Sequence, residues 1–487
     1  MEATAMRISI LLTAMAEVIV LAGTASAQIC PTESRDLTLN RCLSDDPDTA
    51  IAGCARLLLC PQRGWTRAAV LIRRGVAYDR KGAYDRAIRD YTDALSLNPE
   101  EVVALRNRGV AYAHKGLEDE AIRDYTAAVG LKPDYWEAMY QRGMAYDAKH
   151  DYGDAVHDFD RAIELRSDYA PAFAARGLTL YHMQLYERAI QDYNRALQLD
   201  PRFHEALVYR GVAWYDRGLY DRAIEDYDAA LRIKPNSFEA LSDRGNAYKR
   251  KGLYDRAIAD YDRAITIKPT SWDAYRSRGA TYDFIGSYDL AIQDFDRAIM
   301  LKPDYAEAFS DRGTAFAHSG LEDRAVQDYD RAIAANPRLD DAFNNRGVVL
   351  VRKHLYERAA EDFSRAVEIR PDNAEAWSNG CRTFMLLSRL EHAEAECTRA
   401  LELKPSDGGT LAVRGFAYIR LHRPDDAMKD FEAALASNPK DALALYGRGL
   451  VRRLNGQTSA GDADLQAATR LRASVAAEAS AYGVTPP

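Results

Sequence analysis

The hydrophobic residues of this chain recur at helical spacing in segments of about 13 residues, which glycine and proline separate. In one such stretch, the spacing predicts a helix over Trp272–Phe284 and a second helix over Tyr288–Leu301. Gly286 breaks the pattern between them, and Pro303 ends the second helix. The stretch therefore predicts an antiparallel helix pair, which cannot bury its apolar face without stacked neighbours.

The same pattern returns every 34 residues, and a fixed period of this length is typical of stacked helical hairpins. Counting from Trp272 as position 1, small residues hold positions 8, 20 and 27, where we expect two helices to approach closely. Large aromatic residues at positions 11 and 24 fill the space between them, so we interpret these rings as core. The glycine at position 8 recurs, with Cys381 replacing it once, at Gly75, Gly109, Gly143, Gly177, Gly211, Gly245, Gly279, Gly313, Gly347, Gly415 and Gly449.

In this register the chain resembles the tetratricopeptide repeat family. The matching residues are a large residue near position 4, Gly at 8, Tyr at 11, Gly at 15, Tyr at 17, Ala at 20, Tyr or Phe at 24, Ala at 27 and Pro at 32, through twelve repeats from Ala68 to about Ser474. The resemblance implies an all-α fold, a right-handed superhelical solenoid of twelve 34-residue helix-turn-helix units with helical caps. It also implies a concave groove, lined by the first helices, that binds peptides or protein segments. The Arg-Gly and Asp-Tyr signatures are similar to those of exported alphaproteobacterial proteins.

One departure from the family pattern concerns charge. Position 7 is arginine and position 23 is aspartate in eleven of the twelve repeats, from Arg74 and Asp90 to Arg448 and Asp464. We expect a ladder of partly buried Arg–Asp pairs that tie first helix to second, within or between repeats. Such pairs fix register more than they add net stability.

The tenth repeat departs from both rules, because Gly380 and Glu396 stand at positions 7 and 23. The neighbouring positions, 8 and 24, are Cys381 and Cys397. These two positions face each other across the hairpin, so we predict a disulfide that replaces the lost ion pair. The alternative is two small buried thiols.

The two ends of the chain differ from the repeats. Arg7, the apolar run that follows it and the small residues Ala25-Ser26-Ala27 predict a cleaved signal, with an uncleaved amphipathic helix as the alternative. We expect an exported protein, periplasmic or secreted, with no transmembrane segment after signal removal. The expected parts are a signal peptide over 1–27, a cysteine-rich N-terminal cap over 28–67, the repeats over 68–475, and the end of a C-terminal capping helix with a tail over 476–487.

Cysteine usage agrees with export. Four cysteines precede the repeats, and an oxidising compartment favours two disulfides among Cys30, Cys42, Cys54 and Cys60, with three possible pairings. A metal site is the rival interpretation, but the spacing lacks the close CxxC pairs of zinc sites, so we predict no metal.

Composition and motifs argue against several classes of function. The formal net charge of -8 gives no reason to expect nucleic acid as a partner. The sequence contains no GxSxG, Walker or HExxH motif, and its acidic pairs lie on solvated repeat faces. We therefore predict neither an enzyme nor a cofactor.

The resemblance places positions 2, 5, 9, 12 and 13 of each first helix on the groove. The middle repeats present polar, aromatic and charged residues there, among them Tyr140, Tyr181, Tyr215, Asn246, Lys249, Arg250 and Arg276. The last four repeats present apolar residues together with arginines, including Arg352, Phe416, Arg420 and Arg453. An apolar groove that carries arginines suits a peptide with acidic residues, but this patch is equally open to cover by the C-terminal helix or by a second copy.

The first hypothesis is therefore a non-catalytic scaffold that binds peptide or protein segments in its groove and assists envelope or secretion complex assembly. The second is a self-associating structural protein. A third is a protein that binds an envelope polysaccharide through its tyrosine-rich middle groove. The repeat residues specify packing, and the groove residues match no known motif, so the partner is not fixed by the fold.

Overall fold

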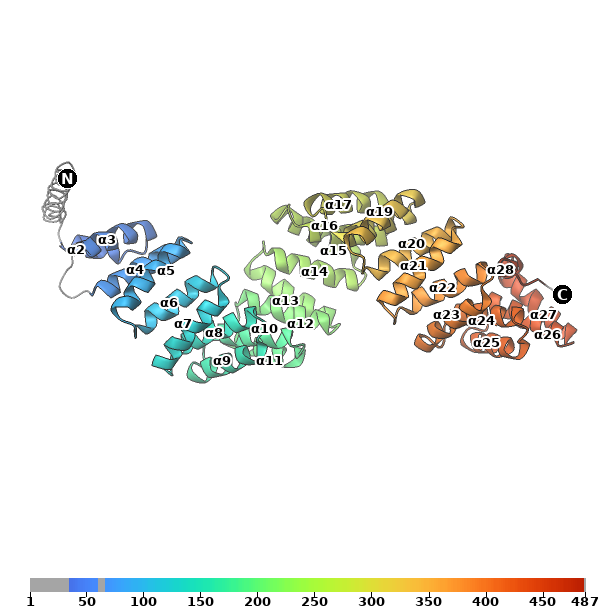
Figure 1. Ribbon diagram of the computed structural model, residues 1–487, viewed down its shortest axis with the longest axis horizontal. Helices are drawn as coiled ribbons and strands as arrows, with labels where there is room; N and C mark the ends of the chain where they lie inside the picture. The colour runs from blue at the N-terminus through green and yellow to red at the C-terminus, as the bar shows by residue number, and fades with distance from the viewer. Residues whose placement is uncertain (1–34, 60–65, 486–487) are drawn as a thin grey trace, which may run out of the picture. The chain divides into compact units, whose positions relative to one another are not determined.

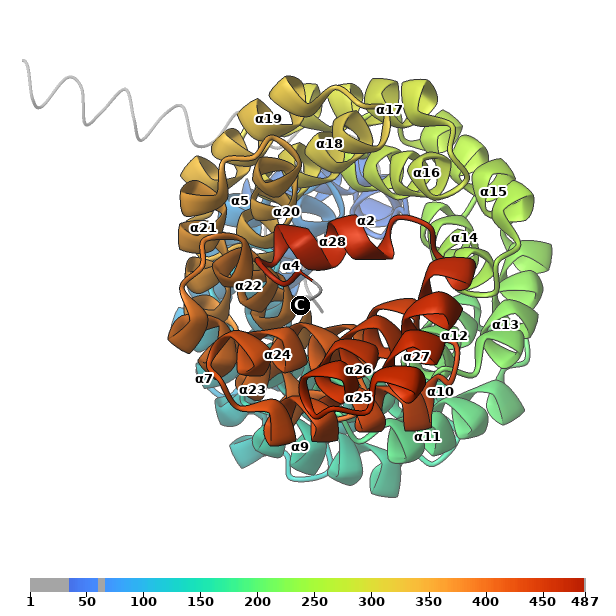
Figure 2. The same cartoon turned by 90° about the vertical axis from the view of Figure 1, so that its right-hand side faces the viewer.

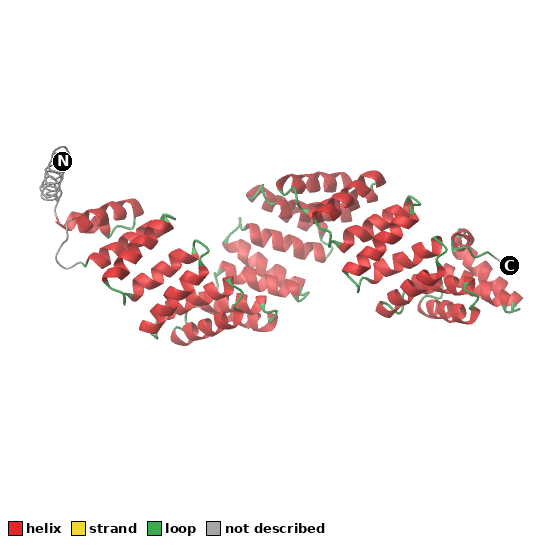
Figure 3. Ribbon diagram, viewed as in Figure 1, coloured by secondary structure: helices red, strands yellow, loops and turns green. Residues whose placement is uncertain are grey.

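The computed structural model describes residues 35–59 and 66–485. The predicted signal peptide, Cys30 and Cys60 lie outside these residues. Within them all regular secondary structure is helical (Figure 3), which confirms the predicted all-α class. None of the described helices is long and apolar enough to cross a bilayer.

The chain forms two compact units, one ending at Pro235 and the other beginning at Asn236 (Figure 1). Unit 1 contains α2 (Arg35–Cys42), α3 (Pro47–Leu59), α4 (Arg67–Arg80), α5 (Tyr84–Leu97), α6 (Val102–Ala113), α7 (Glu118–Leu131), α8 (Trp136–Ala148), α9 (Tyr152–Leu165), α10 (Ala170–His182), α11 (Tyr186–Leu199), α12 (His204–Asp216) and α13 (Tyr220–Ile233).

Unit 2 contains the remaining helices. They are α14 (Phe238–Arg250), α15 (Tyr254–Ile267), α16 (Trp272–Phe284), α17 (Tyr288–Leu301), α18 (Ala306–His318), α19 (Glu322–Ala335), α20 (Asp340–Arg352), α21 (Tyr356–Ile369), α22 (Ala374–Leu386), α23 (Leu390–Leu403), α24 (Gly408–Arg420), α25 (Pro424–Ser437), α26 (Ala442–Leu454), α27 (Thr458–Leu471) and α28 (Val475–Ala481).

Each 34-residue repeat of the sequence is one helical hairpin, from α4–α5 to α26–α27. Inside each unit the second helix of one hairpin packs against the first helix of the next. Figure 2 shows that in unit 2 the first helices α18, α20, α22 and α24 lie inside their partners α19, α21, α23 and α25. The first helices of unit 2 therefore form an inner face, as the family resemblance implied.

The hairpins close because an aromatic ring at position 24 lies on the glycine at position 8. A Cβ atom added to Gly75 would stand 2.6 Å from Cε1 of Tyr91, a ring that is 1% exposed. Phe159 lies in the same way on Gly143, where the added Cβ would be 2.8 Å from its Cε1. The ring at position 24 thus takes the volume that a side chain at position 8 would need, and this contact sets the spacing of the two helices.

The turn within each hairpin requires a left-handed residue at position 15. Gly82 has φ of 71° there, and His150, His354 and His422 take the same conformation with φ of 65°, 59° and 58°. These three histidines therefore occupy the turn position that glycine holds in most repeats. Gln184 and Ser388 take the same position with φ of 61° and 58°, so five turns carry the strain that glycine avoids at the remaining ones.

The predicted Arg–Asp ladder is present in all eleven repeats that carry both residues. Each arginine donates from Nε and Nη2 to the two carboxylate oxygens of the aspartate 16 residues later, at 2.6–2.9 Å. The aspartates are buried and the planar fork matches the carboxylate, so these are strong, directional contacts.

The same arginines also link consecutive repeats. The Nη1 atom of Arg176 donates to Asp160 at 2.5 Å, and that of Arg278 donates to Asp262 at 2.6 Å. A threonine takes the acceptor position elsewhere, as Thr92 does for Arg108. One guanidinium therefore fixes both the closure of its own hairpin and its register on the preceding one.

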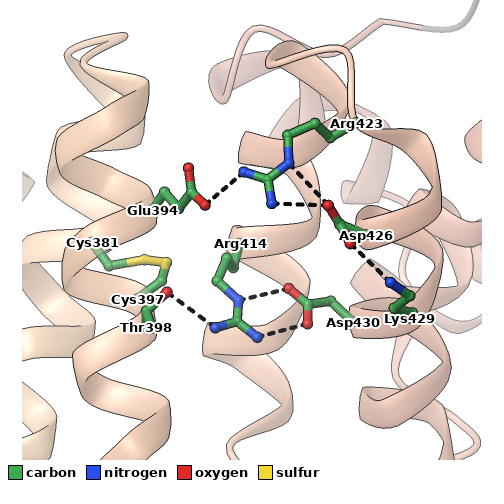
Figure 4. Close-up of polar contacts among 9 residues, drawn as sticks. All are labelled: Cys381, Glu394, Cys397, Thr398, Arg414, Arg423, Asp426, Lys429 and Asp430. Atoms are coloured by element: carbon green, nitrogen blue, oxygen red, sulfur yellow. Dashed lines mark hydrogen bonds and ion pairs between the residues drawn. A yellow bond between two sulfur atoms is a disulfide. The ribbon is translucent and has the colours of Figure 1, made fainter.

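In the tenth repeat a disulfide joins Cys381 of α22 to Cys397 of α23, as predicted, with Cα atoms 5.1 Å apart. Figure 4 shows this bond beside the next rung of the ladder, where Arg414 pairs with Asp430 and also donates to Thr398 at 3.1 Å. The covalent link stands in the structure where the other hairpins carry the ring-on-glycine contact.

The N-terminal cap differs from a single helix. Helices α2 and α3 pack together as a short hairpin against α4. A disulfide between Cys42 and Cys54, with Cα atoms 4.5 Å apart, joins α2 to α3. This selects one pair from the three pairings that the sequence left open.

The C-terminal segment forms a helix of its own beyond the last hairpin. Helix α27 ends at Leu471, and the separate helix α28 packs back on α26 and α27. Val475, Ala479, Tyr482 and Val484 are all buried, in the same cluster as Phe416 of α24. The break between α27 and α28 and the reversal of the chain there have no separate signal in the apolar spacing.

Candidate functional site on the first helices

The candidate site is the surface that the first helices present at positions 5, 9, 12 and 13. In unit 1 it includes three tyrosines from consecutive repeats. Tyr140 of α8 packs against Phe159 and Tyr169, with ring centroids 5.9 and 5.4 Å away, and burial raises the pKa of its hydroxyl to about 12. Tyr140 is thus largely a packing residue that shows one edge at the surface.

Tyr181 of α10 and Tyr215 of α12 lie nearer to the turns. The hydroxyl of Tyr181 donates to Asp216 of the next first helix at 2.5 Å, and its ring lies 5.5 Å from that of Tyr186. The ring of Tyr215 lies 5.4 Å from that of Tyr220. These contacts link neighbouring hairpins, so the predicted tyrosines are brought together along unit 1 but are engaged by the protein itself.

Aspartates at position 12 pair with histidines at position 13 of the following repeat. Asp147 lies 3.3 Å from Nδ1 of His182 in unit 1, and Asp283 lies 3.0 Å from Nδ1 of His318 in unit 2. These pairs bridge adjacent first helices.

In unit 2 the face of α14, α16 and α18 carries Asn246, Lys249 and Arg276. Oδ1 of Asn246 accepts a hydrogen bond from the Tyr261 hydroxyl at 2.8 Å. Arg276 donates from Nε to Asp311 at 2.6 Å and from Nη1 to the Tyr305 hydroxyl at 3.1 Å. Three repeats therefore combine to build this polar cluster.

Lys249 differs from the other members of the cluster. In the described parts of the chain no group accepts a hydrogen bond from its ammonium. Burial and the neighbouring Arg276 guanidinium lower the pKa of this ammonium. Arg250, the next residue, is exposed. The face thus holds a partly buried cation for which the protein supplies no hydrogen-bond acceptor.

Two members of this cluster were not identified from the sequence. Asp311 lies at position 6 and Tyr305 at position 34, neither of which the family resemblance assigned to the groove. Burial raises the pKa of the Asp311 carboxyl. The sequence did contain a signal for this pair, because Asp311 at position 6 follows a repeat that has an arginine, Arg276, at position 5. Opposite charges at these positions of neighbouring first helices can form an ion pair.

The late part of the face is largely occupied. Phe416 is fully buried, with its ring centroid 6.1 Å from that of Tyr482, and Nη1 of Arg420 donates to the Tyr482 carbonyl at 3.2 Å. Of the alternatives for this patch, the structure shows cover by the C-terminal segment. Phe416 is therefore withdrawn from the surface that a ligand could reach, whereas Arg420 stays partly exposed beside the segment.

The other two late arginines also have acidic neighbours. Nε of Arg352 lies 3.4 Å from Glu322, and Nε of Arg453 lies 3.6 Å from Asp462. Both side chains are partly exposed. Within the described chain no cluster of three or more His, Cys, Asp or Glu residues could hold a metal ion.

Comparison with known proteins supports the repeat assignment. The family model described as Tetratricopeptide repeat matches residues 72–135, 140–202, 174–238, 278–340, 342–408 and 414–476, and a second, described as TPR repeat, matches 245–283. A search of curated proteins found no match.

Solved structures of repeat proteins are similar to this chain. The structure of MamA is 30% identical, covers 33% of this chain and 95% of its own, and has a TM-score of 0.32. A tetratricopeptide repeat protein from Parabacteroides merdae is 20% identical over 51% of this chain and 98% of its own, with a TM-score of 0.42. Yeast Tom70 is 17% identical over 84% of this chain and 98% of its own, also with a TM-score of 0.42.

Proposed function

Because this chain belongs to the tetratricopeptide repeat family, we propose that it is a non-catalytic scaffold that binds a protein segment along the inner face of its first helices. The observation that carries the proposal is the contrast in unit 2 between the arginines of the Arg–Asp ladder and Lys249. The ladder arginines are each satisfied by a buried aspartate, whereas Lys249 faces the inner surface with no acceptor among the described residues. The fold does not need the Lys249 ammonium for packing, and its partial burial costs free energy of desolvation. Such a side chain is suited to a binding surface.

The scaffold acts in an oxidising compartment, in the assembly of an envelope or secretion complex. The apolar, small-residue pattern before Gln28 and the bonded pairs Cys42–Cys54 and Cys381–Cys397 support this setting. Each of these disulfides joins the two helices of one hairpin and so stabilises that hairpin locally.

Site-specific photocrosslinking tests the proposal. Phe284 lies at the end of a first helix of unit 2 and is 71% exposed, so a benzoylphenylalanine placed there reports on the inner face. Met300 lies at the end of the neighbouring second helix and is 59% exposed, which makes it a matched control.

The mature protein, expressed from Gln28 in the envelope of a bacterial host, should crosslink to another protein from position 284 and not from position 300. Adducts only between copies of the chain would instead support the self-associating alternative. The absence of any adduct from position 284 would contradict both.

A further inference from the structure

The tenth hairpin, α22 with α23, lacks one rung of the Arg–Asp ladder. In the other eleven repeats the ladder arginine pairs with the aspartate 16 residues later, and its side chain is 12–22% exposed. In the tenth repeat Gly380 replaces the arginine, while Glu396 keeps an acid at the other end of the rung. The Glu396 carboxyl lies beside Gly380, and no described group donates a hydrogen bond to it. The hairpin thus keeps the acceptor of the rung but not its donor.

A second acceptor for the missing arginine is also present. In eight other repeats the ladder arginine donates from Nη1 to a side-chain oxygen 16 residues before it, on the preceding hairpin. The residue at that distance before Gly380 is Ser364 of α21. Ser364 is partly exposed, and its hydroxyl has no hydrogen-bond partner among the described residues. Both acceptors that hold a guanidinium elsewhere in the chain are therefore unused here.

Aromatic residues accompany the same position. In several other repeats the guanidinium carbon of the ladder arginine lies 5.6–5.9 Å from the centre of a ring at position 4 or position 11. The tenth repeat has Trp377 and Phe384 at these two positions of α22. The indole nitrogen of Trp377 donates to the Pro371 carbonyl at 3.0 Å, which fixes its ring. A guanidinium at the rung position would therefore also lie near two aromatic rings.

The acid at position 23 is not needed to close this hairpin. The disulfide between Cys381 and Cys397, the residues that follow Gly380 and Glu396, already joins α22 to α23. An apolar residue in place of Glu396 would avoid the desolvation of a buried carboxyl, which raises the pKa of Glu396 to about 8. A carboxyl that closure of the hairpin does not require, in a place built for an ion pair, is suited to a cation from outside.

We propose that the Glu396 carboxyl and the Ser364 hydroxyl bind a guanidinium group that a ligand supplies from outside the chain, in place of the missing arginine. The planar, fork-shaped group donates to both acceptors, as the ladder arginines do. The complete rungs show that this part of a hairpin accommodates a guanidinium beside a buried carboxylate and close to solvent. Position 7 is not one of the groove positions, so the site does not rest on the proposed function.

Saturation-transfer NMR of the full mature chain with Nα-acetylarginine amide tests the site. This compound resembles an arginine within a protein, and at about pH 8.5 a carboxyl with a pKa of about 8 is mostly ionised. We expect a dissociation constant on the order of 1–10 mM. Nα-acetyllysine amide should bind at least about fivefold more weakly, because an ammonium lacks the fork.

Three variants locate the binding. Glu396→Gln preserves the shape of the side chain and removes its charge, so it should weaken binding at least about tenfold. Glu402→Gln, on the same helix, changes an exposed acid that pairs with Arg399 and should leave the affinity unchanged. Gly380→Arg combined with Glu396→Asp restores the rung within the chain and should also abolish binding.

The outcomes separate the possible ligands. Equal affinity of wild type and Glu396→Gln, or no saturation transfer at roughly 50 mM ligand, would overturn the site. Equal binding of the lysine compound would overturn it in favour of a general cation site. Tighter binding of free L-arginine than of its blocked form would support the site and assign it to the free amino acid rather than to a protein side chain. None of these outcomes bears on the inner face of the first helices.

Discussion

The carboxylate of Glu396 lies in the space that a side chain at Gly380 would fill. In the other repeats an arginine at this position meets a shorter aspartate. Here the longer acid reaches back toward the glycine, and no described group donates a hydrogen bond to it. Burial raises the pKa of Glu396 to about 8, so the tenth repeat holds a carboxyl that stays protonated near neutral pH.

This carboxyl makes stability depend on pH. Its folded pKa of about 8 exceeds its ordinary value of 4.5, so the folded state binds the proton more tightly than the unfolded state. Stability therefore falls as pH rises from about 4.5 to about 8 and then levels off. We expect Glu396→Gln to remove this loss, so that the melting temperature of the variant exceeds that of the wild type at about pH 8.5 and not at about pH 4.5.

Glu402 supplies the control for this prediction. It lies on the same helix, α23, in an exposed pair with Arg399, and its replacement by glutamine should not change the pH dependence. Parallel pH profiles for wild type and Glu396→Gln would show that the carboxyl is not buried as described.

The ladder predicts strong coupling between Arg312 and Asp328. Asp328 is 2% exposed, so Arg312→Met leaves a buried charge with its bidentate partner gone, at a cost of about 3–5 kcal/mol in the free energy of unfolding. The double variant Arg312→Met with Asp328→Leu should recover most of this loss. Urea denaturation of the four proteins in a double-mutant cycle measures the coupling.

An exposed ion pair is the comparison for the ladder. Arg365 and Glu368 are both at least half exposed, so Arg365→Met should cost less than about 1 kcal/mol. If the buried and exposed arginines cost the same, the ladder would have no structural role beyond that of a surface pair.

Most of the fold could be predicted from the sequence because the same residue pattern recurs in every repeat. The predicted helices Trp272–Phe284 and Tyr288–Leu301 coincide with α16 and α17, and the pair Cys381–Cys397 follows from two positions already known to face each other. A position that recurs through the repeats has only one consistent structural explanation. Packing within the hairpin could therefore be inferred without coordinates.

The rest could not be inferred, since it does not repeat. Tyr482 reaches Phe416 only because α28 turns back, and no periodic signal records that reversal. The pair of Arg276 with Asp311 joins positions 5 and 6 of successive repeats and depends on how two first helices sit side by side. The residues on the inner face also vary from repeat to repeat. The sequence therefore predicted which positions face the groove, but it could not predict which of them stay accessible.

Two glycines within helices of unit 1, Gly143 in α8 and Gly130 in α7, should respond oppositely to alanine. At Gly143 a Cβ atom would stand 2.8 Å from Phe159 Cε1, so Gly143→Ala should destabilise unit 1 by about 1–3 kcal/mol through overpacking. At Gly130, an exposed position in α7, no atom lies within 4 Å of the added Cβ, and Gly130→Ala should stabilise by up to about 1 kcal/mol through helix propensity. Thermal unfolding of both variants measures the difference.

A smaller side chain at position 159 provides the rescue for the first of these variants. Phe159→Leu removes the atoms that the new methyl group meets, so adding it to Gly143→Ala should cost less than the sum of the two single changes. Additive losses would mean that the ring does not set the helix spacing.

The C-terminal segment makes the last prediction, because it both caps unit 2 and covers part of its inner face. Val475, Ala479, Tyr482 and Val484 are 0–8% exposed, and Gly483 has φ of 75° with Arg420 packed where its side chain would be. Each large apolar side chain buried in this way contributes about 1.5–3 kcal/mol. Removal of residues 475–487 should therefore lower the melting temperature of unit 2 and increase the binding of a dye that reports exposed apolar surface, while leaving unit 1 unchanged.

A synthetic peptide of residues 475–487 tests whether the segment binds unit 2 at a specific site or whether its removal causes a general loss of packing. Added to the truncated protein, it should restore the melting temperature and displace the dye, and a peptide with Gly483→Ala should do so poorly, since alanine disfavours the positive φ and meets Arg420. Arg420→Ala in the truncated chain should weaken the rescue, because the guanidinium no longer donates to the Tyr482 carbonyl. A truncated protein as stable as the full chain would show that burial of these side chains does not stabilise unit 2.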